Sequence, residues 1–329
     1  MIRAENVTKY YRVTERKEGR WAALRTLVAG KTRLVPAVKE MSFHIPRGGF
    51  VGYIGPNGAG KSTTIKMLTG ILHHDGGQIE IGGRSPQQQR EEVASRIGVV
   101  FGQRTQLWWD LPTRDSFELL AAMYKVAPED YAARMERYGE LLGLDEFLDT
   151  PVRKLSLGQR MRADLAAALL HDPDVLFLDE PTIGLDVTAK AKIRGFLKEL
   201  NEQEGKTILL TTHDMDDIEQ LCKQIIIINH GQKVYDGTLD ELREHYPLPS
   251  TLQVEFQGEV DEFRLPDGAQ YDPAMNKASI LFDKRVTRPL PLIERFGACG
   301  EIRDIQVLTP KIEDVISLIY SEQAAVTIG

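Results

Sequence analysis

Short apolar runs alternate with helical patterns from residue 1 to about residue 245. The runs are GFVGYIG, RIGVVFG, DVLFLDE, KTILLTTHD and QIIIINHG. They are rich in β-branched residues and have the length of strands, and their alternation with helices is typical of a parallel sheet. The pattern predicts a layered α/β fold with a mostly parallel sheet for this part of the chain.

The strand pattern stops between about residues 104 and 172. In this block, DSFELLAAMYKV and YAARMERYGELLGL place apolar residues three and four positions apart. That spacing puts them on one face of a helix. We therefore expect a helical subdomain, residues 104–172, inserted into the α/β core.

A proline-bearing break, HYPLPS at residues 245–250, ends the α/β pattern. After it come TLQVEF, ASILF, PLPLIERFG, EIRDIQVL and KIEDVISLIYSEQ. These segments follow the order strand, strand, helix, strand, helix, which predicts a small α+β domain. The domains that we expect are therefore residues 1–245 and 246–329.

The composition excludes several classes of protein. The net charge of -7 argues against a molecule built to coat nucleic acid. The two cysteines, Cys222 and Cys299, lack the spacing of a zinc site or a disulfide framework. The sequence holds no run of about 18 apolar residues to cross a bilayer. We expect a cytoplasmic protein in which any membrane role passes through a partner.

The segment GPNGAGKST follows the predicted strand FVGYI and precedes the helical pattern TIKMLTGIL. A G-x-x-x-x-G-K-[ST] pattern between a strand and a helix predicts a phosphate-binding loop. Its backbone N–H groups close around the β-phosphate, Lys61 brings a positive charge to the β- and γ-phosphate oxygens, and Ser62 offers a hydroxyl to Mg²⁺. The expected nucleotide-binding residues here are Gly55, Pro56, Asn57, Gly58, Ala59, Gly60, Lys61, Ser62 and Thr63.

A second apolar run, DVLFLDEP at residues 174–181, ends in two carboxylates. Alone, Asp179 and Glu180 are equally well explained as solvated acids at the end of a strand. Beside a phosphate-binding loop, Asp179 can hold Mg²⁺ through its water shell, and Glu180 can orient and deprotonate the attacking water. The pair therefore predicts phosphoryl transfer to water.

The segment KLSLGQR opens a helical pattern and has two explanations. In the first, Ser156 and Gln159 form a capping box at the helix N-terminus. In the second, exposed N–H groups and the positive end of the helix dipole bind an anion, with Ser156 and Gly158 at a phosphate. The motif alone favours the cap, so the choice depends on the rest of the chain.

Three further residues indicate a function through their order along the chain and not one by one. Gln103 ends the run GVVFGQ, Asp186 lies in PTIGLD and His213 ends TILLTTH. The full order is phosphate-binding loop, Gln, LSLGQ, Asp-Glu, Gly-Leu-Asp, His. Over about residues 1–240 this order resembles the nucleotide-binding subunit of ATP-binding-cassette transporters.

The resemblance implies a role for each matching residue. Gln103 would contact Mg²⁺ and the attacking water, and His213 would contact the γ-phosphate. Tyr11 would stack on adenine, with Tyr10 as the alternative if the register is shifted by one; a tyrosine in a strand core is the other explanation. Asp186 would lie at the bound nucleotide.

The resemblance also implies an ATP-sandwich dimer with a second copy of the chain or a paralogous ATPase subunit. Two chains packed head to tail would place Ser156, Gly158 and Gln159 of one chain at the ATP held by the other. The segment LSLGQ differs from the family's commonest form, LSGGQ, because Leu157 stands at the first glycine. Ser156 and Gly158, which meet the phosphate in the family, are kept.

A basic insert at residues 12–35, RVTERKEGRWAALRTLVAGKTRLV, indicates which type of ABC transporter the chain resembles. It holds seven Lys and Arg residues against two Glu. Trp21, Leu24, Leu27 and Val28 fall on one helical face, and basic amphipathic helices commonly lie at a membrane surface or against a partner. A solvated loop packed on its own domain is the alternative. An insert at this place resembles the gate-type helix of ABC-2-like polysaccharide exporter ATPases.

Two other segments bear on the same question. Trp108 and Trp109 follow Gln103 closely, in the region that receives the permease's coupling helix in this family. Exposed tryptophans would suit a protein-binding groove, whereas a position in the helical core is the alternative. The C-terminal segment resembles the small domain that follows the cassette in daunorubicin-type drug-resistance exporters.

These features predict a peripheral ATPase subunit at the cytoplasmic face of the cell membrane. It would bind ATP and Mg²⁺ and power separate permease subunits of the ABC-2 type, with no nucleic acid partner. One alternative is a soluble cassette ATPase that is not coupled to transport, which the single phosphate-binding loop and the lack of sustained heptads disfavour. A second is a non-catalytic nucleotide sensor, which the intact Glu180 and His213 disfavour.

Overall fold

The computed structural model describes residues 1–14, 32–102 and 104–328. The chain divides into two compact units, Met1–Leu239 and Asp240–Gly329. Among the described residues, no helix combines the length and the apolar character needed to span a bilayer.

The division between the units falls before the break that the sequence suggested at residue 245. Helix α9 (Leu239–His245) groups almost entirely with the second unit. The reason is packing, because Arg243 and Tyr246 line a pocket together with Thr309 and Val315 near the other end of that unit. The proline-bearing break therefore lies inside the second unit.

A sheet with the strand order β5-β6-β7-β3-β8-β9 forms the centre of the first unit. Its strands from β5 to β8 pair in parallel, whereas β9 is antiparallel to β8. The bounds are β3 (Phe50–Ile54), β5 (Ile97–Phe101), β6 (Val175–Asp179), β7 (Thr207–Thr211), β8 (Gln224–Asn229) and β9 (Gln232–Gly237). The predicted mostly parallel sheet is confirmed, with one antiparallel strand at its edge.

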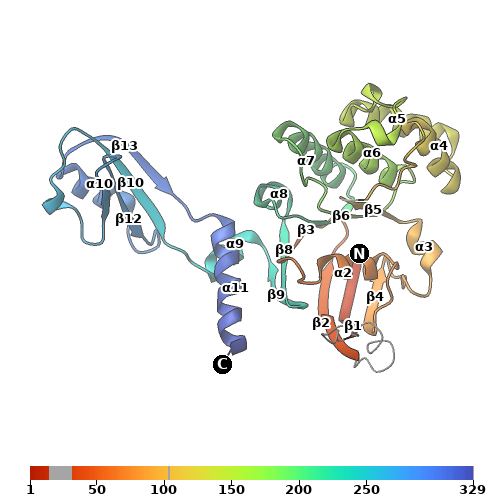
Figure 1. Cartoon of the computed structure of the whole chain (residues 1–329), viewed down its shortest axis with the longest axis horizontal. Helices are drawn as coiled ribbons and strands as arrows, with labels where there is room; N and C mark the ends of the chain where they lie inside the picture. Colours follow the sequence, from red (N-terminus) through yellow and green to blue (C-terminus); the bar gives the residue numbers. More distant parts are fainter. Residues whose placement is uncertain (15–31, 103, 329) are drawn as a thin grey trace, which may run out of the picture. The chain divides into compact units, whose positions relative to one another are not determined.

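An antiparallel sheet and helix α2 cover one face of the central sheet (Figure 1). The antiparallel sheet has the order β2-β1-β4. Its core side chains, such as Val7, Phe43 and Ile79, pack with Tyr53 and Phe177 of the central sheet. The bounds are β1 (Ile2–Thr14), β2 (Thr32–Ile45), β4 (Gly76–Ile81), α2 (Lys61–Leu68) and the short α3 (Arg90–Ala94). The apolar pattern did not predict this sheet, because strands with one exposed face carry fewer apolar residues in a row.

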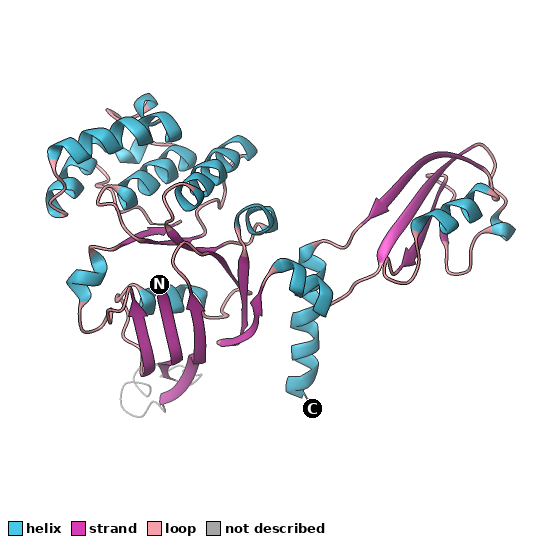
Figure 2. Cartoon of the chain, turned by 180° about the vertical axis from the view of Figure 1, so that it is seen from behind, coloured by secondary structure: helices cyan, strands magenta, loops and turns pink. Residues whose placement is uncertain are grey.

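Helices cover the opposite face of the central sheet, as Figure 2 shows from behind. Their bounds are α4 (Thr113–Met123), α5 (Pro128–Leu142), α6 (Leu157–Leu169), α7 (Val187–Glu202) and α8 (Met215–Leu221). Helices α4 to α6 form the predicted inserted subdomain. Helix α5 begins at Pro128, which suits the first helical position, and ends before Gly143 in the left-handed conformation.

The second unit is a small α+β structure with a sheet of order β11-β12-β10-β13. Helix α10 packs on this sheet through Phe296, which is buried with Val254, Phe256 and Ala278. The bounds are β10 (Ser250–Gln257), β11 (Gln270–Asp272), β12 (Lys277–Phe282), α10 (Pro289–Gly297), β13 (Glu301–Leu308) and α11 (Ile312–Ile328). The observed order includes the expected strands and helices, and adds β11, which is too short to produce a pattern.

Asp164 of α6 holds the start of the helical block, at Thr105 and Gln106, against helix α6. Its Oδ1 accepts hydrogen bonds from Thr105 Oγ1 (2.8 Å) and Gln106 N (3.1 Å). The side chain is buried, and this burial raises the pKa of Asp164 to about 6, although the two hydrogen bonds and the nearby Arg160 charge oppose the shift. Folding therefore favours the protonated form of this carboxyl.

Asp164 should make the stability of the protein fall as the pH rises from about 4 to about 7. The folded carboxyl keeps its proton up to its raised pKa, whereas the unfolded one loses it near its ordinary value, so deprotonation of the folded state costs free energy. Asp164→Asn keeps an acceptor for Thr105 and Gln106 but has no charge to bury. The mutant's free energy of unfolding, relative to wild type, should therefore rise by roughly 1 to 3 kcal/mol over this range.

Denaturant unfolding of both proteins at pH 4.5 and pH 7.5 would measure this difference. Glu118→Gln, which removes an exposed carboxylate on α4, is the matched control and should give no such trend. A mutant-minus-wild-type difference that is the same at both pH values would show that Asp164 is not a buried carboxyl with a raised pKa.

Candidate functional site

The loop between β3 and α2 is closed by backbone contacts. Gly60 caps α2 with a φ of 107°, and a Cβ at this position would lie 2.6 Å from the carbonyl oxygen of Ala37, so only glycine fits. Ala59 N donates to Pro56 O (3.1 Å), and Ala59 O accepts from Gly231 N (3.0 Å). These contacts fix the start of α2, where N–H groups without intrahelical partners can face an anion.

Lys61 is the first residue of α2 and is 7% exposed. Its ammonium donates hydrogen bonds to the carbonyl oxygens of Gly55 (2.5 Å) and Pro56 (3.3 Å). Burial lowers the pKa of Lys61, and the negative charges of Glu180 and Asp179 oppose that shift. The loop thus holds a positive charge close to two carboxylates, as the sequence predicts.

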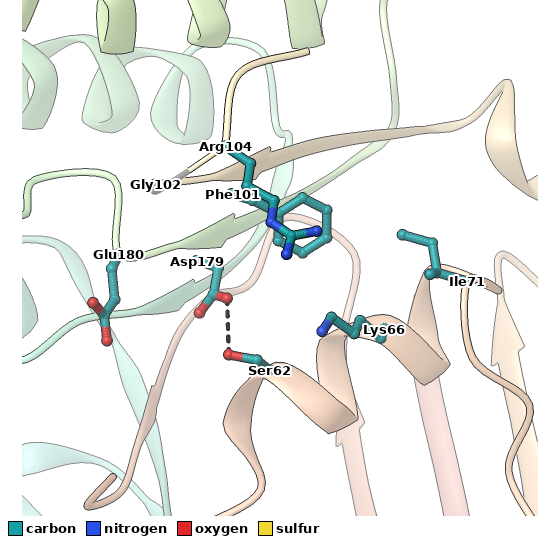
Figure 3. Close-up of a pocket in the computed structure, with 8 residues that line it drawn as sticks. All are labelled: Ser62, Lys66, Ile71, Phe101, Gly102, Arg104, Asp179 and Glu180. Carbon is teal, nitrogen blue, oxygen red and sulfur yellow. Dashed lines mark hydrogen bonds between the residues drawn. The ribbon is translucent and has the colours of Figure 1, made fainter. Parts of the chain in front are cut away.

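Asp179 joins the ends of strands to helix α2. Its Oδ2 accepts a hydrogen bond from Ser62 Oγ (3.0 Å), drawn as a dashed line in Figure 3, and its Oδ1 accepts one from Thr211 Oγ1 (2.6 Å). Its backbone carbonyl accepts from Gly102 N (2.8 Å). The hydroxyl and the carboxylate predicted to serve Mg²⁺ are therefore in direct contact.

Glu180 and His213 also meet, with 2.9 Å between Glu180 Oε1 and His213 Nε2. Glu180 has a φ of 57°, a left-handed conformation that is uncommon for a residue with a side chain. Its N–H donates to the carbonyl oxygen of Thr211 (2.9 Å), which helps to hold this conformation. A carboxylate fixed by an imidazole can orient a water molecule and accept its proton.

A cleft of about 320 Å³ lies between α2 and the ends of β5 and β6 (Figure 3). Its lining residues are Ser62, Lys66, Ile71, Phe101, Gly102, Arg104, Asp179 and Glu180. Lys66 and Arg104 add positive charge to this cleft, and the sequence analysis missed both. Lys66 belongs to an ordinary helical pattern and Arg104 to no motif, so only the folded chain reveals them. Gln103 lies outside the described residues, and its predicted contacts with Mg²⁺ and water stay a prediction.

Tyr11 lies on the ribbon of β1 and β2, where it pairs with Val35. Tyr10 and Tyr11 are both about two-fifths exposed, so neither is a core residue. Adjacent residues of a strand point to opposite faces, and one nucleotide can use only one of the two rings. Ala37, two residues after Val35, lies against Gly60, which brings this part of the ribbon next to the phosphate-binding loop.

Ser156 and Gln159 form the predicted capping box at the start of α6. Ser156 Oγ accepts from Gln159 N (3.2 Å), and Ser156 N donates to Gln159 Oε1 (3.0 Å). Asp186 caps α7 in a similar way, because its carboxylate accepts from Ala189 N (2.8 Å). Both predicted nucleotide contacts thus have a structural role within their own chain.

The two capped helix ends border one depression of about 640 Å³. Its lining residues are Ser156, Leu157, Gly158, Gln159, Arg162, Gly184, Leu185, Asp186, Thr188, Ala189 and Lys192. It has no lining residue in common with the cleft at Ser62 and Asp179. Within this chain, the structure therefore does not bring LSLGQ to the phosphate-binding loop.

The expected partner surfaces are described only in part. Residues 15–31 of the basic insert, with Trp21, Leu24, Leu27 and Val28, lie outside the described residues. Trp108 and Trp109 are 38% and 50% exposed, so the helical-core alternative is wrong for both. The guanidinium of Arg160 lies 5.6 Å from the ring centroid of Trp109, and half of this residue stays exposed.

Comparisons with known proteins agree with this geometry. Residues 38–183 match the family model described as ABC transporter. The chain is 36% identical over 214 residues to the ABC transporter ATP-binding protein NatA of Bacillus subtilis, which covers 65% of this chain and 87% of NatA. It is 38% identical over 234 residues to the Nod factor export ATP-binding protein I of Burkholderia thailandensis, covering 71% and 73% of the two chains.

A third relative and a solved structure extend the likeness. The linearmycin resistance ATP-binding protein LnrL of Bacillus subtilis is 32% identical over 263 residues, which cover 80% of this chain and 77% of LnrL. The dimeric post-hydrolysis structure of the ATP-binding cassette MJ0796, bound to ADP and Pi, superposes with a TM-score of 0.61 at 28% identity, covering 73% of this chain and 99% of that one. The chain therefore belongs to the ABC transporter family, as one of its ATP-binding, ATP-hydrolysing proteins.

Proposed function

We propose that this protein is the ATPase subunit of an ABC-2-type exporter. In this proposal it dimerises around two ATP–Mg²⁺, lies peripherally at the cytoplasmic face of the membrane and drives separate permease subunits. The observation that carries the chemistry is the contact between Glu180 and His213 beside the Ser62–Asp179 hydrogen bond. Together these side chains supply a base, a partner that fixes the base, and oxygen ligands for a cation.

The phosphates of ATP bind at the N-terminus of α2. Lys61 exchanges its hydrogen bonds with Gly55 and Pro56 for the β- and γ-phosphate oxygens, which offer the ammonium full negative charges. The hydroxyl of Ser62 and the carboxylate of Asp179 are hard oxygen donors of the kind that Mg²⁺ prefers. When bound there, Mg²⁺ neutralises the negative charge that develops on the phosphate oxygens.

The positively charged rim of the cleft supports the same assignment. Lys66 and Arg104 line it together with Ser62 and Asp179, so an anion entering the cleft meets cations on two sides. Tyr11 would stack on the adenine ring, since its ribbon runs past Gly60. Gln103 would link the nucleotide to the helical subdomain, where Asp164 fixes the segment that follows it.

Hydrolysis uses Glu180 as the general base. Its carboxylate accepts a proton from the attacking water, and the water oxygen attacks the γ-phosphorus as the bond to the leaving ADP oxygen breaks. His213 keeps the carboxylate oriented and contacts the γ-phosphate. The backbone hydrogen bond from Glu180 to Thr211 holds the base at the end of β6.

A second chain completes each site. In one chain the cleft at Ser62 and Asp179 and the depression at Ser156 have no lining residue in common. A head-to-tail arrangement would bring Ser156, Gly158 and Asp186 of one chain to the ATP bound by Lys61 of the other. The dimeric form of the related cassette MJ0796 supports this arrangement.

The exporter assignment rests on relatives and on exposed surfaces. Relatives named for Nod factor export and linearmycin resistance favour transport over a soluble ATPase that is not coupled to a permease. The exposed Trp108 and Trp109 offer an apolar surface for a helix of the permease. The basic insert at residues 12–35 would contact the permease or an anionic membrane surface.

The role of Glu180 can be tested by Glu180→Gln, which keeps the size of the side chain but cannot take a proton at neutral pH. ATP binding should persist, hydrolysis should slow by roughly 10²- to 10⁴-fold, and the ATP-bound dimer should accumulate. Steady-state ATPase rates and size-exclusion chromatography with ATP would measure these effects, with Glu118→Gln as the control. A mutant that hydrolyses ATP within a few-fold of wild type would remove Glu180 from this role.

The two-chain site can be tested by Gly158→Asp. A Cβ at Gly158 would meet Ala189 and Leu185 at 3.6 and 3.8 Å, which are ordinary contacts, so the fold should persist. A carboxylate facing the γ-phosphate should block ATP-driven dimerisation and hydrolysis by like-charge repulsion. Gly195→Asp is a matched control, because its Cβ would point into open space on α7.

Mixing chains gives a second readout for the same site. A dimer of one Gly158→Asp chain and one Lys61→Ala chain has both defects in one site and neither in the other. Some ATPase activity should therefore return on mixing, unless both sites must act together. Dimerisation and turnover equal to wild type in Gly158→Asp alone would show that LSLGQ is only a helix cap.

The insert can be tested without disturbing the ribbon that carries it. Thr14 pairs with Thr32 across β1 and β2, so an Asn-Gly turn in place of residues 15–31 can close the hairpin. The isolated subunit should keep its ATPase activity, while transport by the full complex or recruitment to anionic vesicles should fall. A Gly/Ser linker of equal length separates loss of length from loss of the basic and apolar side chains. Unchanged transport and recruitment with both variants would support the solvated-loop alternative.

A further inference from the structure

A buried carboxylate, Asp217, contacts residues that lie close to Glu180 and His213 in the sequence. Asp217, in the first turn of α8, has an exposed fraction of 0%. Its Oδ2 accepts hydrogen bonds from Thr182 Oγ1 (2.5 Å) and Thr212 Oγ1 (3.1 Å), and its Oδ1 accepts one from Arg194 Nη1 of α7 (2.9 Å). Both oxygens are thus engaged, and the buried negative charge has a positive partner, as such a charge requires.

The two threonines connect this carboxylate to the catalytic residues. Thr182 lies two residues after Glu180, and Thr212 lies immediately before His213. One oxygen of Asp217 therefore connects the segment after Glu180 with the segment before His213. The side chains of Glu180 and His213 meet at 2.9 Å. Among the described hydrogen bonds, the link through Asp217 is the one that connects Thr182 with Thr212. It is made by side chains and does not depend on the backbone hydrogen bonds of the sheet.

Two ion pairs connect helix α7 with the start of helix α8. Arg194 of α7 pairs with Asp217 at 2.9 Å, and Lys190, one turn earlier, pairs with Asp214 at 2.5 Å. The turn between Glu180 and α7 is thereby fixed at two places, through Thr182 in its middle and through α7 at its end. Asp186 caps the start of α7 at the end of the same turn.

The backbone conformation of Glu180 suggests what these contacts do. Its φ of 57° is strained for a residue with a side chain, and such strain persists only where the surroundings impose it. Glu180 N is held by Thr211 on one side. On the other side, Ile183 N donates to the Glu180 carbonyl oxygen (3.3 Å) and Thr182 donates to Asp217. Loss of the Asp217 contact would leave only that long backbone bond to hold the turn at Glu180.

We infer that Asp217 is a positioning residue that sets the geometry of Glu180 and His213 for hydrolysis. This inference rests on the proposed role of Glu180 as the general base. Net stability alone is a weak reason for the network, because a buried ion pair costs about as much in desolvation as it returns. Lys61 and Ser62, the proposed contacts of the phosphates and of Mg²⁺, have no described contact with Asp217, so it acts on turnover and not on ATP binding.

The sharpest test replaces one hydroxyl with a methyl group. Thr182→Val has the same shape as threonine but cannot donate to Asp217, whereas Thr182→Ser keeps the donor. In the full-length protein, Thr182→Val should lower kcat for ATP hydrolysis between about 10- and 100-fold, the scale of a misplaced catalytic group, with KM for ATP within about twofold of wild type. Thr182→Ser should restore most of the activity. Asp217→Asn should give the same split and a partial accumulation of the ATP-bound dimer.

Glu199→Gln is the matched control for loss of an arginine–carboxylate pair at α7. Glu199 pairs with Arg137 at 3.1 Å and has no described contact with Thr182 or Thr212. Its kcat should stay close to wild type, even if its melting temperature falls as much as that of Asp217→Asn. A loss of activity that follows melting temperature across all these variants would overturn the inference.

A double mutant separates this inference from the proposed function. If Asp217 acts through Glu180, adding Thr182→Val to Glu180→Gln should lower turnover no further. If Glu180→Gln itself keeps wild-type turnover, the proposed base is wrong and the positioning role ends with it. If Glu180→Gln is inactive but folded Thr182→Val has the wild-type kcat, the proposal that Glu180 is the general base is kept. Only the positioning role of Asp217 is then overturned. Thr182→Val decides the matter alone if Asp217→Asn fails to fold.

Discussion

The register of three parallel strands positions the side chains that we propose to be catalytic. Phe101 of β5, Asp179 of β6 and Thr211 of β7 are aligned across the sheet. Parallel strands end at the same edge, so whatever follows each strand in the sequence arrives at one place. Glu180 and His213 follow the aligned ends and meet there, and Asp179 bonds across the same edge to Thr211. A slip of one residue in any pairing would turn these side chains to the wrong face of the sheet.

The two helix starts that we propose to contact ATP border different hollows of the same chain. Helix α2 follows the central strand β3, so its N-terminus lies at the sheet edge with Asp179. Helix α6 belongs to the inserted subdomain, and its N-terminus borders the start of α7. Each helix start offers unpaired N–H groups, but the surroundings differ: one cleft has Lys61 nearby and a base, and the other depression has neither. In the proposed mechanism the phosphate reacts in the first cleft, and a second chain would add the donors at the start of its own α6.

Sequence reasoning reached the parts of the site that depend on local chemistry. A glycine-rich turn between a strand and a helix needs no long-range information, and neither does a carboxylate pair at the end of an apolar strand, so Lys61, Ser62, Asp179 and Glu180 were predictable. The sheet of β1, β2 and β4 was not, because alternating strands give a weak pattern. Asp217 and Thr182 are 35 residues apart in the chain, and nothing local indicates that they meet. Lys66 and Arg104 reach the cleft for the same reason, by folding and not by motif.

The capping box and the anion site at LSLGQ are compatible because they use different groups. In the box, Ser156 Oγ accepts one N–H, that of Gln159, at 3.2 Å. A hydroxyl that accepts can still donate its own proton, and the N–H groups of Leu157 and Gly158 have no carbonyl partner within the helix. The box therefore orients the serine and leaves its proton and two backbone donors facing outward. A helix start fixed in this way loses little entropy when an anion binds, so the cap is compatible with the contact that we propose with a second chain's ATP.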